Sequence, residues 1–108
     1  MPRSWRWTIL VRIRDLAGQG KVRFTLKALQ ELAALDLGLD EEDGRQVVAT
    51  LSAKDVADRL VSRQTGEWMY VFRPTVAETV VYLKLIVRTD CVVVSFHEDE
   101  DENHEAEP

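Results

Sequence analysis

Apolar residues in the first half of the chain recur at the spacing of helices. Thr25 is a favoured N-cap for a helix over residues 26–35. The apolar residues that mark the predicted buried face of this helix are Leu26, Leu29, Leu32 and Ala33. Asp40 can cap a shorter helix that runs through Thr50, and the acidic residues of its first turn suit the positive end of the helix dipole. Both segments are therefore predicted to be helical.

The segments on either side of these helices are harder to assign from spacing. Ser52, followed three residues later by Asp55, has the form of a capping box and predicts a further helix over residues 53–62. In residues 8–17 the apolar positions fit both the alternation of a strand and the stripe of a helix. The pattern alone leaves both assignments open for residues 8–17.

The second half of the chain has apolar residues with a period of two. Strands are predicted over residues 68–73, 79–88 and 92–97, and Pro74 ends the first of them. Helices followed by an antiparallel meander indicate an α+β fold. We expect N-terminal helices to pack on one face of a C-terminal antiparallel sheet.

The connection between the last two strands decides which residues face each other. A two-residue turn over residues 89–90 pairs Arg88 with Cys91 and Tyr82 with His97. A four-residue turn keeps this pairing, whereas a three-residue turn breaks it. The two-residue turn is the prediction.

This register separates the hairpin into an apolar and a polar face, because side chains alternate along a strand. The polar face holds Tyr82, Lys84, Ser95 and His97. The apolar face, predicted to pack against the helices, consists of Val81, Leu83, Leu85, Val87, Val92, Val94 and Phe96.

The polar face carries groups that could cleave RNA without a metal. That reaction needs a base for the 2′-hydroxyl, an acid for the 5′-oxygen leaving group, and cations for the charge on phosphorus. A phenol, an imidazole and an ammonium or guanidinium group supply these functions. The alternative is an outer sheet face that carries polar residues only because it meets water, and spacing alone leaves both readings open.

Composition and charge place these elements in one domain with an acidic end. The chain has 108 residues, 45% of them hydrophobic, and a net charge of -5. Seven of its acidic residues lie between residues 98 and 108, so residues 1–96 hold 14 basic against 12 acidic residues. We expect a single domain over residues 1–98, basic in its N-terminal third, and a disordered acidic tail over residues 99–108.

Several classes of protein are excluded by composition. No apolar run approaches the length of a membrane span, and no signal-peptide cleavage site follows the basic N-terminus. Cys91 is the single cysteine, which excludes an internal disulfide and a multi-cysteine zinc site. We expect a cytoplasmic protein that uses no metal or cofactor and binds no membrane.

The chain resembles the MqsR family of bacterial toxins over about residues 8–98. No single short motif carries the resemblance, since matching segments occur in the family's order and nearly its spacing. These segments are Gly20-Lys21-Val22-Arg23, Leu37-Gly38-Leu39-Asp40, Leu51-Ser52 with Asp55, Arg73-Pro74, Val81-Tyr82-Leu83-Lys84 and Val94-Ser95-Phe96.

The resemblance implies a RelE-like fold in which residues 8–17 are helical. It also implies the toxin of a type II toxin–antitoxin system, a metal- and ribosome-independent endoribonuclease that cleaves single-stranded mRNA at GC-containing sites such as GCU. The implied partner is a cognate antitoxin with a DNA-binding domain.

The family's catalytic positions transfer in part. Its active-site tyrosine matches Tyr82, and its C-terminal lysine falls on His97, which can also exchange protons. Its glutamine falls on Met69, and a lysine in its helix falls on Asp58. Two of the four positions are therefore substituted.

Basic residues near these positions are the remaining candidates. Arg73 and Lys84 are predicted to contact RNA phosphates, and Lys54 and Arg59 are predicted to replace the missing lysine from the helix over residues 53–62.

Two classes of function follow. The first is an active endoribonuclease toxin, and the second is a catalytically weakened or inactive RelE-like domain that binds RNA or a partner protein.

Overall fold

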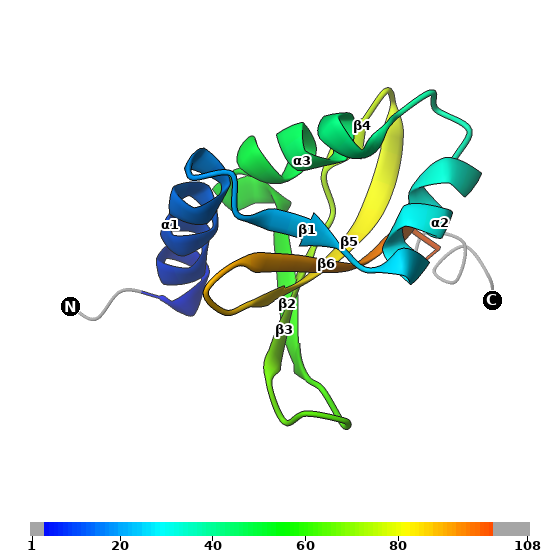
Figure 1. Ribbon diagram of the computed structural model, residues 1–108. Coiled ribbons are helices and arrows are strands. Elements are labelled where there is room, and N and C mark those ends of the chain that lie inside the picture. The colour runs from blue at the N-terminus through cyan, green and yellow to red at the C-terminus, as the bar shows by residue number, and fades with distance from the viewer. Residues whose placement is uncertain (1–3, 101–108) are drawn as a thin grey trace, which may run out of the picture.

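The computed structural model describes residues 4–100, which form an α+β fold with helices packed on one face of a mixed sheet (Figure 1). The helices are α1 (Trp5–Gly18), α2 (Leu26–Ala34), α3 (Glu41–Ala49) and a 3₁₀ turn, η1 (Ala53–Asp55). The strands are β1 (Val22–Phe24), β2 (Val56–Val61), β3 (Trp68–Phe72), β4 (Thr75–Val76), β5 (Thr79–Val87) and β6 (Cys91–Glu98). The strand order is β1-β6-β5-β3-β2, with β4 paired to β5 outside this path.

Helix α1 settles the ambiguous segment as helical. The Ser4 side chain accepts a hydrogen bond from the Trp7 backbone N–H and caps the helix. Leu10, Ile13 and Leu16 are buried at the spacing of one helical face. The resemblance therefore implied the correct element.

Residues 101–108 of the predicted tail lie outside the described residues.

The caps predicted for α2 and α3 are confirmed. Thr25 accepts a hydrogen bond from the Ala28 N–H at 3.1 Å, and Asp40 forms a reciprocal capping box with Asp43. The predicted buried face of α2 is wrong at its first and last residues, because Leu26 is 72% exposed and Ala33 is exposed as well, whereas Leu32 is 3% exposed. The helix packs instead through Ala28 and Leu32.

The predicted helix over residues 53–62 is wrong. The Ser52–Asp55 capping box is present, but it starts only the single turn η1, and strand β2 follows. β2 pairs antiparallel with β3, and the Arg73 N–H donates to the Asp55 carbonyl at 2.8 Å. Pairing with a distant strand supplies the backbone hydrogen bonds that a helix would have made locally. Figure 1 shows the β2–β3 hairpin extending beyond the rest of the sheet.

The antiparallel strands β3, β5 and β6 are confirmed, and β1 adds a parallel edge that was not predicted. β1 pairs with β6 over Val22–Phe24, opposite residues 91–93. Three residues are too few to show a period-two pattern, so the sequence carried no signal for this strand. The sheet is therefore mixed, not purely antiparallel.

The β5–β6 register is correct at Tyr82 but wrong near the turn. Val87 pairs with Cys91, so the turn has three residues, and the predicted Arg88–Cys91 pair does not form. A bulge at Val94 of β6, which lies without a paired residue between Val93 and Ser95, restores the register. Tyr82 consequently still pairs with His97.

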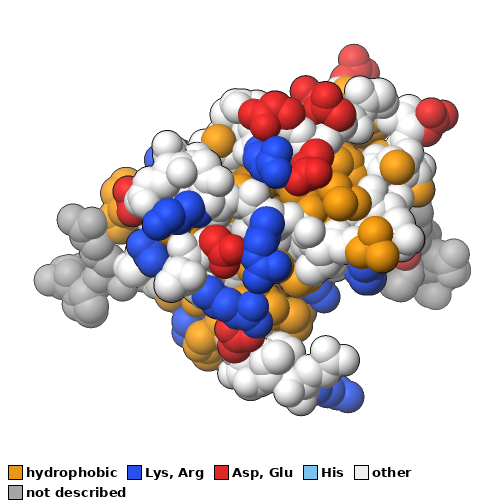
Figure 2. Space-filling model, viewed as in Figure 1, with side chains coloured by type: hydrophobic (Ala, Val, Ile, Leu, Met, Phe, Trp, Pro, Cys, Tyr) orange, Lys and Arg blue, Asp and Glu red, His pale blue; other side chains and the backbone are white. Residues whose placement is uncertain are grey.

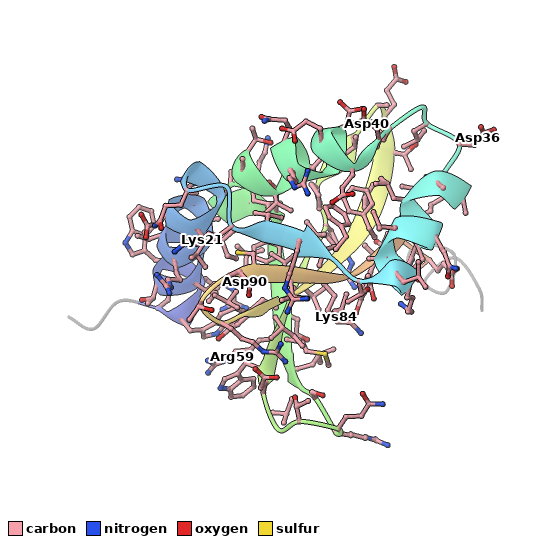
Figure 3. All side chains as sticks on the ribbon, viewed as in Figure 1. Lys21, Asp36, Asp40, Arg59, Lys84 and Asp90 are labelled. Carbon is pink, nitrogen blue, oxygen red and sulfur yellow. The ribbon has the colours of Figure 1, made fainter. Side chains whose placement is uncertain are left out.

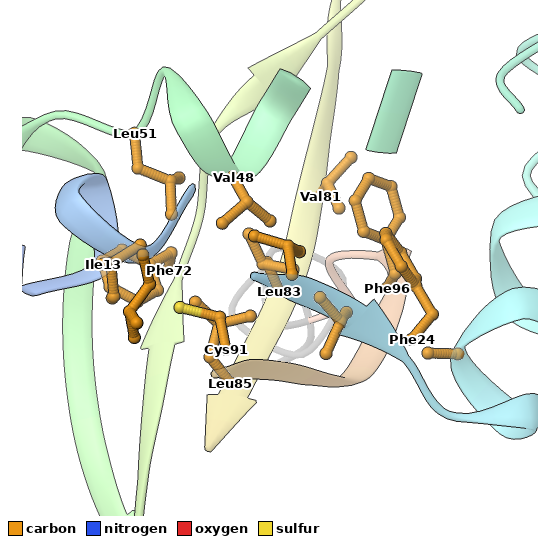
Figure 4. Close-up of a cluster of buried hydrophobic side chains, with 14 of the residues drawn as sticks. Ile13, Phe24, Val48, Leu51, Phe72, Val81, Leu83, Leu85, Cys91 and Phe96 are labelled. Carbon is orange, nitrogen blue, oxygen red and sulfur yellow. The ribbon is translucent and has the colours of Figure 1, made fainter. Parts of the chain in front are cut away.

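The bulge also changes which β6 residues enter the core. Phe96 packs in the core with the helices, as predicted. Cys91 and Val93 join it there in place of the predicted Val92 and Val94. Figure 4 shows Cys91 and Phe96 in this cluster. Val81, Leu83 and Leu85 of β5 are fully buried there, as predicted. Burial raises the pKa of the Cys91 thiol to about 11, so this cysteine is a core side chain rather than a reactive one.

Within residues 4–100 there is no helix with the length and apolar character needed to cross a membrane.

Candidate active site

Tyr82 and His97 lie side by side on the sheet face opposite the core. Their rings stack with centroids 5.0 Å apart and planes inclined by 10°. They are paired residues of β5 and β6, and both side chains are half-buried. The neighbours of Tyr82 on its own strand, Val81 and Leu83, point into the core and fix the phenol on the opposite face.

The hydrogen bond of His97 assigns its neutral tautomer. His97 Nδ1 lies 2.8 Å from the Glu98 carbonyl oxygen. A carbonyl oxygen only accepts, so Nδ1 must carry the proton when this bond forms. In the neutral ring Nε2 is then the nitrogen with a lone pair, and it is the atom that can accept a proton.

Two cationic side chains approach the Tyr82 ring. Arg73 Cζ lies 5.6 Å from the ring centroid, and Lys84 Nζ lies 5.9 Å from it. Both distances are within the range of cation–π attraction. The hairpin and the end of β3 therefore bring together a phenol, an imidazole, a guanidinium and an ammonium group. These groups belong to four of the predicted site residues.

An acidic residue that sequence reasoning assigned to the tail joins this group. Asp99 Oδ2 lies 3.2 Å from Arg73 Nε, and the Asp99 side chain is only 4% exposed. Its backbone N–H donates to the Val80 carbonyl at 2.9 Å, which continues the β5–β6 ladder by one residue. Nothing in a run of acidic residues distinguishes Asp99 from its neighbours, so the sequence carried no signal for this contact.

Helix α2 supplies two further residues that were not predicted. Lys27 Nζ lies 3.2 Å from Ser95 Oγ and 3.0 Å from Glu31 Oε2. Glu31 Oε1 accepts a hydrogen bond from the backbone N–H of Phe96 at 2.9 Å. Phe96 lies on β6 beyond the residues that pair with β1.

Glu31 is held in its charged form by these partners. Burial alone would raise the pKa of Glu31, but the Phe96 N–H and the Lys27 ammonium lower it below its usual value. The Lys27–Glu31 pair therefore holds the edge of β6 at Phe96, the residue before His97.

A hollow of about 560 Å³ adjoins Lys84 and Ser95 on the same face. Its floor includes the apolar side chains of Met69, Ile86 and Val92. Its charged lining residues, all basic, are Arg23, Lys27, Lys84 and Arg88. Figure 2 shows Lys and Arg side chains gathered over β1 and the β5–β6 turn, whereas acidic side chains gather over α3.

Some of these cations are already engaged by carboxylates outside the hollow. Arg23 Nε lies 2.7 Å from Asp90 Oδ2, and Arg88 forms two hydrogen bonds to Glu67. The hydrogen bonds from Arg88 lower the pKa of Glu67 to about 2. Lys84 of β5 lines the hollow and also has its Nζ 5.9 Å from the Tyr82 ring centroid.

Comparison with known proteins identifies the family. Residues 7–98 match the family described as motility quorum-sensing regulator, toxin of MqsA. The chain belongs to this MqsR family. It is also similar to the mRNA interferase toxin MqsR of Escherichia coli (strain K12), with 36% identity over 92 residues that cover 84% of this chain and 92% of the relative.

The four positions that the MqsR resemblance singled out lie on one sheet face. Lys84 of β5 pairs with Val71 of β3, which pairs with Asp58 of β2, and paired residues of neighbouring strands share a face. Met69 pairs with Ile86 and lines the hollow. Met69 and Asp58, the two positions predicted to be substituted, thus share the face of Tyr82 and His97.

The structure does not bring Arg59 or Lys54 to this face. Arg59 pairs with Tyr70 and shares the opposite face, where its guanidinium lies 4.9 Å from the Trp5 ring centroid and 4.1 Å from that of Trp68 (Figure 3). Lys54 lies in η1 and lines a different hollow, which includes Pro74. Their predicted role depended on a helix over residues 53–62, and that helix does not form.

Proposed function

We propose that this protein is the toxin of a type II toxin–antitoxin system, an endoribonuclease of RelE-like fold that cleaves mRNA at GC-containing sites without a metal or the ribosome. The observation that carries the proposal is the stacked Tyr82–His97 pair, with Arg73 and Lys84 both within 6 Å of the Tyr82 ring. The name of the Escherichia coli relative, an mRNA interferase toxin, supports the same activity.

The proposed reaction is an attack of a ribose 2′-oxygen on the neighbouring phosphorus. His97 Nε2 takes the proton of the 2′-hydroxyl as the oxygen–phosphorus bond forms. Tyr82 gives its phenolic proton to the 5′-oxygen as the bond from phosphorus to that oxygen breaks. Arg73 and Lys84 stabilise the charge on the non-bridging oxygens. The products are a 2′,3′-cyclic phosphate and a 5′-hydroxyl, and proton exchange with water restores both side chains.

The hollow beside Lys84 is the proposed path of the RNA strand next to the scissile phosphate. Its charged lining residues are all cations, which suit a polyanion, and its apolar floor suits the face of a base. Ion pairs such as Arg88–Glu67 keep part of this charge engaged with the protein. We therefore expect moderate, salt-dependent binding of single-stranded RNA.

The proposed protein partner is an antitoxin that neutralises the toxin and carries its own DNA-binding domain. The family's description as a toxin of MqsA supports such a partner. A toxin that acts on mRNA would work in the cytoplasm.

Expression in a bacterial host tests this function. The wild-type protein should arrest growth, and the His97→Ala variant, made at the same level, should not. If both proteins leave growth unchanged and purified wild type binds RNA without cutting it, the non-catalytic class of function replaces the toxin.

The acidic tail gives a separate prediction about RNA affinity. Ending the chain after Glu100 removes four acidic residues but leaves the Asp99–Arg73 contact in place. Affinity for RNA should rise in the truncated protein, most at low salt, since unscreened acidic residues repel phosphates. Filter binding at about 20 mM and 200 mM salt measures this. Equal affinities at low salt would reduce the tail to a solubilising segment.

A further inference from the structure

Two groups of different kinds lie close to the Arg73 side chain among the described residues. Asp99 Oδ2 lies 3.2 Å from its Nε, and the Tyr82 ring centroid lies 5.6 Å from its Cζ. The backbone around Arg73 is fixed as well, because its N–H donates to the Asp55 carbonyl and Pro74 follows it. Asp99 is therefore close enough to influence the orientation of the guanidinium plane.

We propose that Asp99 is a positioning residue that orients the Arg73 guanidinium beside Tyr82 for contact with the scissile phosphate. The contact is an ion pair and does not have the geometry of a hydrogen bond, but a buried carboxylate 3.2 Å from Nε favours one orientation of the guanidinium over others. This inference rests on the proposed function, because it assigns Arg73 to the phosphate of an RNA substrate.

Burial favours a positioning role over competition with RNA for Arg73. The Asp99 side chain is 4% exposed, whereas that of Arg73 is 32% exposed. A phosphate can approach the part of the guanidinium that is exposed to solvent, whereas the carboxylate is almost completely buried. The N–H of Asp99 is also bonded to Val80, which fixes this carboxylate to the end of the sheet.

Asp99 differs in burial from its neighbours in the acidic run. The family match ends at residue 98, one residue before Asp99. Glu98 and Glu100, its neighbours in the acidic run, are exposed, and Asp99 alone of the three is buried. One acidic residue of this run is thus built into the site.

A double-mutant cycle tests whether Asp99 acts through Arg73. Steady-state cleavage of one RNA oligonucleotide is compared for wild type, Asp99→Asn, Arg73→Ala and the double variant. Asp99→Asn keeps the shape of the side chain and removes its charge, and misplacement of a catalytic group costs up to about 10²-fold in rate. We expect kcat to fall about 10- to 100-fold with little change in KM, and no further fall when Asp99→Asn is added to Arg73→Ala.

A matched control separates position from charge. Glu100→Gln removes the same charge from an exposed neighbour and should leave kcat within about twofold. Melting temperatures of all variants identify any that unfold. Wild-type rates in Asp99→Asn, losses that multiply in the double variant, or faster cleavage without Asp99 would each overturn the inference.

A spectroscopic measurement decides the inference without enzyme activity. The Nε–H resonance of Arg73 should be sharp and slow to exchange in wild type, and should broaden or exchange quickly in Asp99→Asn, but not in Glu100→Gln. An unchanged resonance contradicts the positioning role even if the wild type cuts RNA. If the wild type cuts no RNA, the proposed function fails, while this resonance still reports whether Asp99 orients Arg73.

Discussion

His97→Ala should reduce the rate of RNA cleavage by about 10²–10⁴-fold, the usual contribution of a general acid or base. The imidazole is the group whose geometry fits proton transfer best, since its Nδ1 is bonded to the Glu98 carbonyl and Nε2 remains to accept a proton. Single-turnover cleavage of a labelled oligonucleotide measures the loss. Binding of an oligonucleotide with a 2′-deoxy nucleotide at the cleavage site should change much less, because the protein keeps its cationic residues.

Tyr82→Phe provides the companion measurement with the least structural change. It removes one hydroxyl and leaves the ring to stack on His97 and to contact Arg73 and Lys84. A loss in the same range identifies the hydroxyl as a catalytic group, whereas a wild-type rate would reduce Tyr82 to a packing residue. Met69→Gln, which restores the family residue beside the hollow, should raise the rate if its loss is a handicap.

Leu32→Ala should destabilise the protein by about 2–5 kcal/mol, the cost of deleting a buried leucine side chain. Leu32 is 3% exposed and packs α2 into the core against the sheet. The total free energy of unfolding for a domain of this size is about 5–15 kcal/mol, so this single change removes a large share. Urea unfolding followed by circular dichroism measures the difference.

Leu26→Ala is the matched control on the same helix. Leu26 is 72% exposed, so the same chemical change should alter stability by no more than about 0.5 kcal/mol. Equal losses in the two variants would contradict the observed packing of α2 and support the face predicted from sequence periodicity.

Local signals in the sequence identified the elements that depend on local interactions. Thr25 and Asp40 cap α2 and α3 because each bonds to a backbone N–H three residues away. Alternation located β3, β5 and β6, whose residues divide between a core face and an outer face. These features need no knowledge of distant parts of the chain.

Features that depend on distant partners could not be predicted in this way. The Ser52–Asp55 box is a genuine local signal, but pairing of β2 with β3 overrides it after one turn. The three-residue turn at residues 88–90 and the bulge at Val94 compensate each other, so the register at the site was correct although the turn was not.

The candidate site was predicted in part, because some of its residues follow a local pattern and others depend on distant partners. Tyr82, Lys84 and His97 lie on one hairpin, and alternation alone places them on one face. Arg59 was misassigned because its face depends on the pairing of β2, and Asp99 was missed because its contact with Arg73 joins residues far apart in the sequence.

Identification of the ends of the RNA products tests most directly whether residues of this chain alone cleave RNA. Purified protein is incubated in EDTA with an RNA oligonucleotide containing a GCU sequence, and the ends of any products are identified by mass spectrometry. We predict a 2′,3′-cyclic phosphate on one product, a 5′-hydroxyl on the other, and no cleavage by His97→Ala. RNA that is bound but remains intact with the wild-type protein would contradict the account.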